Sequence, residues 1–140
     1  MGIEAFIWRY ENRENTSFPL TDVLGAFSSH TVGFDATTGV LSVRFGNEVN
    51  SCDIYLGEDA ANTGFTKGLM FARPVRALEL WECVFELMNS GNVILFFSDD
   101  TTPLYASAGA PDHFPPDLLD SLGVPKQVAT PQAIVESHES

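Results

Sequence analysis

The stretch from Glu79 to Asp100, ELWECVFELMNSGNVILFFSDD, decides the expected fold. In its first half the apolar residues recur at a helical spacing, and Gly91 can take the left-handed conformation that commonly ends a helix. Its second half, NVILFFS, is apolar on both faces, as is typical of a central strand in a sheet. We therefore predict one long amphipathic helix at about residues 74–89, followed directly by a buried strand.

Alternation of residue types predicts the other strands. EAFIWRY, at residues 4–10, alternates large aromatic side chains with other residues, and CDIYL, at residues 52–56, alternates apolar with polar ones. Between them lie two strand-like runs and a turn, in which Asp35 can bond back to the backbone and Gly39 can take a positive φ. We expect an α+β fold: an antiparallel, meander-like sheet of five or six strands, with the helix at about 74–89 packed on one face and short flanking helices.

The domain organisation follows from length and proline content. A chain of 140 residues is long enough for one domain with a real core, so we expect residues 1–140 to form a single domain. Residues 1–108 are expected to form its α+β core. Residues 109–140 hold five of the eight prolines and form a proline-rich C-terminal segment, in which PPDLLDSL and the residues after Thr130 favour short helices.

The chain is strongly acidic, and the charge is concentrated in its second half. Nineteen acids against seven bases give a net charge of −12, and residues 77–140 contribute ten acids and a single base, Lys126. Phosphate groups are bound by clustered Lys and Arg, so this composition argues against nucleic acid and against an anionic membrane surface as partners. A protein with a basic surface is the partner that the charge favours.

Five acids make up the candidate site for such a partner. Glu79, Glu82 and Glu86 fall within an arc of about 60° on the polar side of the predicted helix. Asp99 and Asp100 follow at the end of the next strand. The alternative interpretation is a solvated helix face, followed by a turn that the two aspartates form with the residues after them.

No catalytic, metal or cofactor site is predicted. The three histidines are far apart in the sequence, the two cysteines do not make a disulfide framework, and no zinc-binding or nucleotide-binding motif is present. Asp112 and His113 stand between prolines in GAPDHFPPD, which is typical of a rigid surface loop. In the alternative interpretation, these two side chains line a pocket between the sheet and the C-terminal segment.

No membrane-associated segment is predicted. Apolar runs such as Val93–Phe97 are far shorter than a membrane span, and the first residues lack the basic lead and the cleavage site of a secretory signal. We therefore expect a cytoplasmic protein.

These observations favour a small acidic protein-binding module that is not an enzyme. Its size and charge are typical of small bacterial immunity proteins and inhibitors, which bind and neutralise a cationic toxin or nuclease. One alternative is a small enzyme or ligand-binding domain that uses the pocket just described. A second is a self-assembling structural protein, for example one derived from a phage, that associates through an exposed strand edge.

Overall fold

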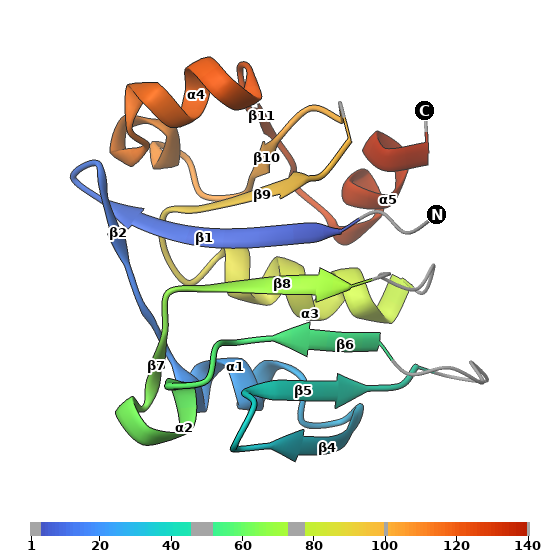
Figure 1. Cartoon of the computed structure of the whole chain (residues 1–140). Coiled ribbons are helices and arrows are strands. Elements are labelled where there is room, and N and C mark those ends of the chain that lie inside the picture. Colours follow the sequence, from blue (N-terminus) through green and yellow to red (C-terminus); the bar gives the residue numbers. More distant parts are fainter. Residues whose placement is uncertain (1–3, 46–51, 73–77, 100, 140) are drawn as a thin grey trace.

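The computed structural model describes residues 4–45, 52–72, 78–99 and 101–139, which form a mixed α+β fold (Figure 1). Within these residues nine strands join one sheet, and two more form a small separate ladder. The main sheet contains β1 (Ala5–Glu11), β2 (Glu14–Thr16), β4 (Thr31–Asp35), β5 (Val40–Val43), β6 (Cys52–Tyr55), β8 (Gly68–Ala72), β9 (Val93–Phe97), β10 (Leu104–Tyr105) and β11 (Lys126–Gln127). The separate ladder pairs β3 (Phe18–Pro19) with β7 (Phe65–Thr66). The helices are α1 (Leu20–Ala26), α2 (Ala60–Thr63), α3 (Leu78–Met88), α4 (Pro116–Leu122), α5 (Pro131–Glu139) and the 3-10 helix η1 (Ala110–His113).

β1 lies in the middle of the sheet, and this is where the predicted meander is wrong. The order of strands is β11-β10-β9-β1-β8-β6-β5-β4, with β2 paired to one end of β1. The chain leaves β8, passes through α3 and returns as β9 on the far side of β1. Because β8 and β9 both run antiparallel to β1, they are parallel to each other, and β8–α3–β9 is a split β-α-β unit. Alternation indicates which residues share a face of a strand, but it does not indicate which strand is the neighbour.

The predicted number of strands is also wrong, because nine strands join the sheet in place of five or six. Two of the nine, β2 and β11, have three and two residues. A run of this length gives no periodicity in the sequence. All neighbouring strands are antiparallel except β10 and β11, which are parallel.

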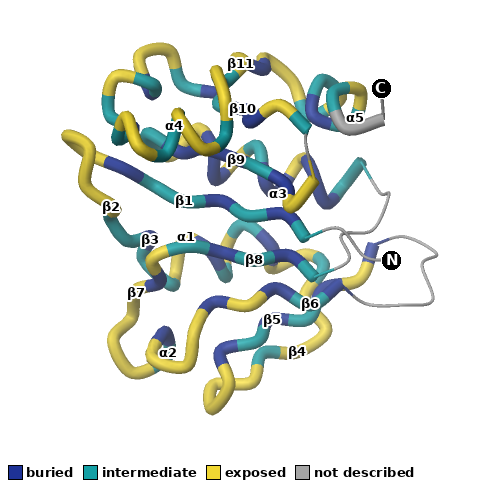
Figure 2. The backbone as a smooth tube through the Cα atoms, turned by 45° about the horizontal axis from the view of Figure 1, so that its top comes forward, coloured by how far each residue is buried: buried dark blue, intermediate teal, exposed yellow. Residues whose placement is uncertain are grey.

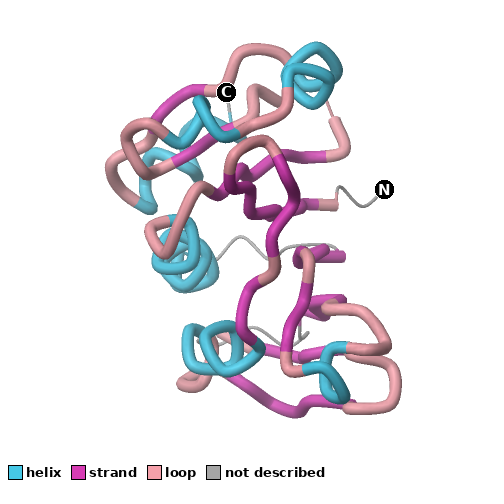
Figure 3. Tube along the Cα trace, turned by 90° about the vertical axis from the view of Figure 1, so that its left-hand side faces the viewer, coloured by secondary structure: helices cyan, strands magenta, loops and turns pink. Residues whose placement is uncertain are grey.

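The prediction of one long helix is wrong as well. The predicted helix is α3, which has 11 residues, and residues 74–77 lie outside the described residues. Eleven residues span about 16 Å, less than half the width of eight strands spaced about 4.8 Å apart. One face of the sheet is therefore covered jointly by α1, α3 and α5, and Figure 3 shows helices on this side. We call it the back face, and the opposite one the front face.

The main core lies between the back face and these helices. Ile7 and Phe71 project from the central strands and are fully buried, as is Leu80 of α3. The other side of β1 differs, because Phe6 and Trp8 point to the front face and are only half-buried. Figure 2 shows β1 with both buried and intermediate residues along its length. The most buried side of this strand is thus the side opposite its large aromatic residues.

The front face is covered at one end. There η1 and α4 pack on β1, β9 and β10 through a second apolar cluster, which includes Tyr10, Ile94, Ala110 and Phe114. In the described part of the chain, no helix covers the stretch of the front face from β8 to β5 (Figure 1). This leaves a large half-buried surface in the middle of the sheet.

Local predictions are confirmed at the turn after Asp35 and at two C-terminal helices, whereas the left-handed helix end predicted at Gly91 is wrong, because the φ of Gly91 is not positive. Between β4 and β5, the Asp35 carboxylate accepts hydrogen bonds from the backbone N–H groups of Thr37 and Thr38 at 2.9 and 3.3 Å, and Gly39 has a φ of 74°. The helix predicted in PPDLLDSL is α4, and the helix predicted after Thr130 is α5. None of the helices that the structure describes is long and apolar enough to cross a bilayer.

Candidate partner-binding surface

The described charged side chains on the helices of the back face are all acidic. α1 and α5 both pack against α3, and none of the three helices contains a Lys or Arg. Their described acids are Asp22, Glu79, Glu82, Glu86 and Glu136; Glu79 is half-buried and the other four are exposed. We call these five residues the acidic helix surface.

The sequence of α3 explains why its carboxylates point outward. Leu80, Val84 and Leu87 are buried against the sheet, and they share one side of the helix. Glu82 and Glu86 are one turn apart on the other side and are exposed. Burial of the apolar side fixes the rotation of the helix about its axis, and this rotation places the carboxylates in solvent.

Cys83 reports the electrostatic field of this surface. Its thiol is buried, and burial together with the nearby carboxylates of Glu86, Glu82 and Glu79 raises its pKa from 9.0 to about 11. A thiolate is the reactive form of cysteine, so this raised pKa makes Cys83 a poor nucleophile. The carboxylates of all three glutamates add to the effect of burial on this pKa.

The negative charge of α3 is not neutralised within the described residues. Neither Glu79, Glu82 nor Glu86 forms a hydrogen bond or an ion pair with another described side chain. Like charges at helical spacing destabilise a helix by a few tenths of a kcal/mol per pair, so this arrangement has a small stability cost that a bound cation would remove.

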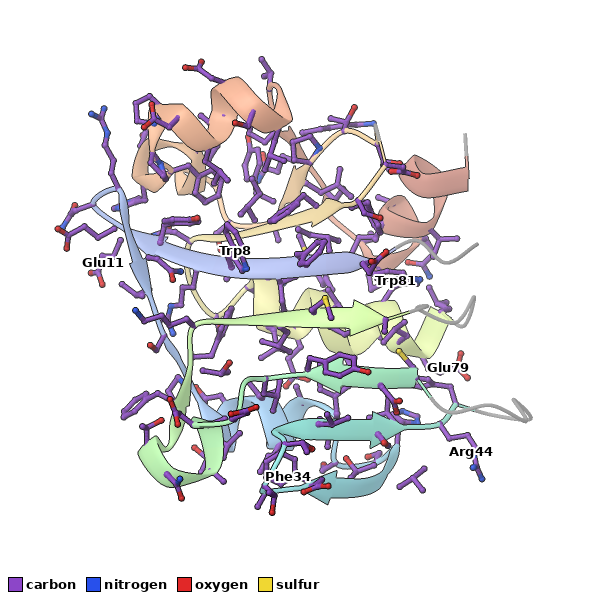
Figure 4. The ribbon with its side chains drawn as sticks, in the orientation of Figure 1. Trp8, Glu11, Phe34, Arg44, Glu79 and Trp81 are labelled. Atoms are coloured by element: carbon purple, nitrogen blue, oxygen red, sulfur yellow. The ribbon has the colours of Figure 1, made fainter. Side chains whose placement is uncertain are left out.

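Asp99 follows the end of β9, a strand that packs against α3. The rings of Trp81 and Phe97 contact each other with centroids 6.0 Å apart, which holds the end of β9 beside this helix. Figure 4 shows Glu79 and Trp81 at the same end of the molecule. The Asp99 carboxylate accepts a hydrogen bond from the backbone N–H of Thr101 at 2.9 Å, as in the turn that the sequence offered as the alternative. Asp100 lies outside the described residues.

Asp112 and His113 lie on the opposite side of the sheet from the acidic helix surface. His113 holds the turn between β1 and β2: its Nδ1 accepts a hydrogen bond from the backbone N–H of Asn12 at 3.0 Å, and its carbonyl oxygen accepts one from Arg13 at 2.9 Å. Asn12 and Arg13 have positive φ values of 53° and 71°. Asp112 is exposed. The described hydrogen bonds of His113 are thus with the turn between β1 and β2. Asn12 and His113 are 101 positions apart, so the sequence alone could not indicate that they lie together.

The sequence did not indicate the hollows on the front face. One, of about 390 Å³, lies over β8 and is lined by Phe6, Trp8, Tyr55, Met70 and Lys67 among others. A second lies over β5 and β6 and includes Ser42, Asp53 and Tyr55. Tyr55 lines both hollows. Neither is lined by Asp99, Asp112 or His113.

No protein-family model, curated protein or solved structure matches this chain. Among the residues that the structure describes, no three His, Cys, Asp or Glu side chains lie close enough together to hold a metal ion. Function is therefore inferred from the chemistry of the surfaces.

Proposed function

We propose that this chain is a small acidic protein-binding module that binds a cationic protein through its acidic helix surface. The observation that carries the proposal is that every charged side chain described on α1, α3 and α5 is an acid, and that those of α3 form no ion pair with another described side chain. A surface of one sign attracts a partner of the opposite sign and speeds the encounter, by about 10-fold to 1,000-fold when the geometry is favourable. The kind of module we favour is an inhibitor or immunity-type protein that neutralises a basic toxin or nuclease.

The two alternatives have less support. A small enzyme would need polar groups that converge on a pocket, whereas Asp99 and His113 each make hydrogen bonds to backbone N–H groups of a turn. Self-assembly through a sheet edge would need a long, regular edge strand. β4 has an irregularity between Thr31 and Gly33, and β11 at the other edge has two residues. Short and irregular edge strands are devices that natural sheets use to avoid edge-to-edge pairing.

The test is capture of a partner by three forms of the chain from an extract of its native cells. The first form is the wild type. In the second, Glu79, Glu82 and Glu86 are each replaced by Lys. In the third, Glu11, Glu14 and Glu58, which are exposed and lie outside the acidic helix surface, are replaced by Lys. The second and third forms carry the same net charge, so that a general charge effect cannot separate them.

The proposal predicts that the wild type and the third form capture the same basic protein, and that the second form loses it. Thermal unfolding of all three forms should be similar, because reversal of exposed charges seldom changes stability by more than about 0.5 kcal/mol. Equal capture by the second and third forms would remove the acidic helix surface from the proposal. Capture of a partner without a basic surface would refute the proposed partner chemistry.

A further inference from the structure

A row of five apolar side chains crosses the front face at right angles to the strands. The register pairs Val40 with Tyr55, Tyr55 with Met70, Met70 with Phe6, and Phe6 with Phe96. At about 4.8 Å per strand, the row is about 19 Å long. We call these five residues the cross-sheet row. The sequence alone does not indicate this row, because its members come from five strands that are separated in the sequence.

The cross-sheet row is partly exposed and well ordered by its own contacts. Four of its members are half-buried, and Tyr55 is 40% exposed. The rings of Phe6 and Phe96 stack with centroids 5.0 Å apart, and Trp8 contacts Phe96 edge-on at 5.1 Å. Aromatic residues and Met are enriched at the centres of protein interfaces, where rigid side chains lose little entropy on binding.

Gly68 lets the Trp8 ring lie on the front face of β8. It lies beside Met70 on this face, and a Cβ atom at this position would come within 2.8 Å of the Trp8 Nε1. The Trp8 ring therefore occupies the space above Gly68, and together with Met70 and Tyr55 it lines the hollow over β8. An apolar side chain of a partner can pack against these three side chains.

A carboxylate flanks the row. Asp53 precedes Tyr55 by two residues on β6, so both side chains point to the front face about 7 Å apart along the strand. One oxygen of Asp53 accepts a hydrogen bond from the Ser42 hydroxyl at 2.9 Å, and the carboxylate forms no ion pair with any described base. An acid held beside an aromatic ring is complementary to an arginine or a lysine, which can pair with the carboxylate while it covers the ring of Tyr55.

We propose that the front face is a second docking surface, which binds a polypeptide segment of a protein partner that places an Arg or Lys against Asp53 and an apolar side chain in the hollow beside the cross-sheet row. From Asp53 to Gly68, which lines the hollow, is one strand across and two same-face steps along, or about 14 Å. Residues i and i+4 of an extended chain are about 13 Å apart and point the same way. The segment is therefore an extended one, with a cation four residues from an aromatic or large aliphatic residue. This surface is opposite the acidic helix surface and does not depend on the function proposed for it.

The test is a selection of random linear 12-residue peptides displayed on phage against the wild-type chain. The enriched peptides should carry an Arg or Lys four positions from an aromatic or large aliphatic residue. Tyr55→Thr should weaken their binding tenfold or more, and Asp53→Asn should weaken it about fivefold, as expected for an aromatic anchor and a partly exposed ion pair.

Two matched controls separate this surface from the rest of the molecule. Val32→Thr changes an apolar residue that is 56% exposed on β4 but lies outside the row, and it should leave binding unchanged. The helix-surface triple variant, with Glu79, Glu82 and Glu86 replaced by Lys, should also bind normally. Failure to enrich any peptide, or equal binding by the Tyr55→Thr and Val32→Thr variants, would overturn the proposal. Failure of the function proposed above would appear in the capture experiment with the native partner, which does not use these peptides.

The two tryptophans supply a second readout in one spectrum. Trp8 lies beside the hollow on the front face, whereas Trp81 is buried in the core under the back face. When a selected peptide is titrated into the ¹⁵N-labelled chain, the indole N–H signal of Trp8 should move and that of Trp81 should stay. Movement of Trp81 alone would place the peptide elsewhere and contradict the proposal.

Discussion

The contact between Trp8 and Gly68 yields a quantitative test of the front face. The Gly68→Ala substitution adds one methyl group at the point where the Trp8 ring lies. A Cβ at Gly68 would collide with Cδ1 of Trp8 and would lie 2.8 Å from its Nε1 and 3.0 Å from the backbone oxygen of Ile7. The φ of Gly68 is outside the left-handed region, so the alanine backbone is unstrained and the cost is one of packing.

The size of the effect is a difference between two opposing contributions. Overpacking costs about 1–3 kcal/mol, because Trp8 is held by Phe96 and Tyr10, at 5.1 and 6.5 Å between ring centroids. Replacement of a glycine within a strand by alanine gains about 0.5–1 kcal/mol from backbone entropy. We expect a net loss of about 0–2.5 kcal/mol in the free energy of unfolding.

Urea unfolding measures this difference, and the chain has a matched control. Gly33, on β4, also has a φ outside the left-handed region, and a Cβ there would meet nothing within 4 Å. Gly33→Ala should therefore be neutral or slightly stabilising. In a Trp8→Val background Gly68→Ala should lose its cost, because the ring that it displaces is gone. The reasoning is refuted if Gly68→Ala and Gly33→Ala unfold at the same urea concentration.

Three further predictions concern the remaining described contacts. Burial and the nearby glutamates raise the pKa of Cys83 to about 11 in the native protein, whereas the unfolded thiol ionises near pH 9.0. The free energy of unfolding should therefore fall as the pH rises from about 9 to about 11. In urea unfolding over this range, the Cys83→Ala variant should lack this decrease. His113→Ala should lower the free energy of unfolding by about 1 kcal/mol and speed hydrogen exchange at the Asn12 amide. His113→Asn keeps an acceptor near the Nδ1 position, so it should lower the free energy of unfolding less. Equal losses in the two variants would contradict the assigned hydrogen bond. The buried Thr66 hydroxyl donates a hydrogen bond to the Leu56 carbonyl oxygen at 2.6 Å, and the Thr66→Val substitution would remove this donor. The substitution should therefore lower the free energy of unfolding by about 1–3 kcal/mol, as measured by urea unfolding. Thr66→Ser keeps the hydroxyl and should cost clearly less.

The sequence predicted local structure well where one residue type dictates a conformation. Asp35 and Gly39 define a hairpin turn by side-chain bonding and by positive φ, and both behave as expected. The helix at PPDLLDSL is also as predicted. In each case the physical cause acts over a few residues, so the sequence contains it.

Strand order could not be predicted, because it depends on contacts between distant residues. β1 is paired with β8 and β9, whose residues are 60 or more positions further along the chain, and nothing in EAFIWRY specifies those neighbours. The cross-sheet row depends on this order, and so does the hydrogen bond from Asn12 to His113. By contrast, the sequence alone predicted that Glu82 and Glu86 lie on the same side of α3, because this follows from the period of a helix.

Association kinetics test the central claim most directly. The rate constant for binding of the captured basic partner should be measured by stopped flow at an ionic strength of about 0.01 M, where charges act over about 30 Å, and at about 0.15 M, where they act over about 8 Å. The account predicts that replacement of Glu79, Glu82 and Glu86 by Lys slows association at the lower salt by tenfold or more. Replacement of Glu11, Glu14 and Glu58 by Lys should slow it much less at the same net charge. Equal rates for these two variants would contradict the claim that the acidic helix surface meets the partner.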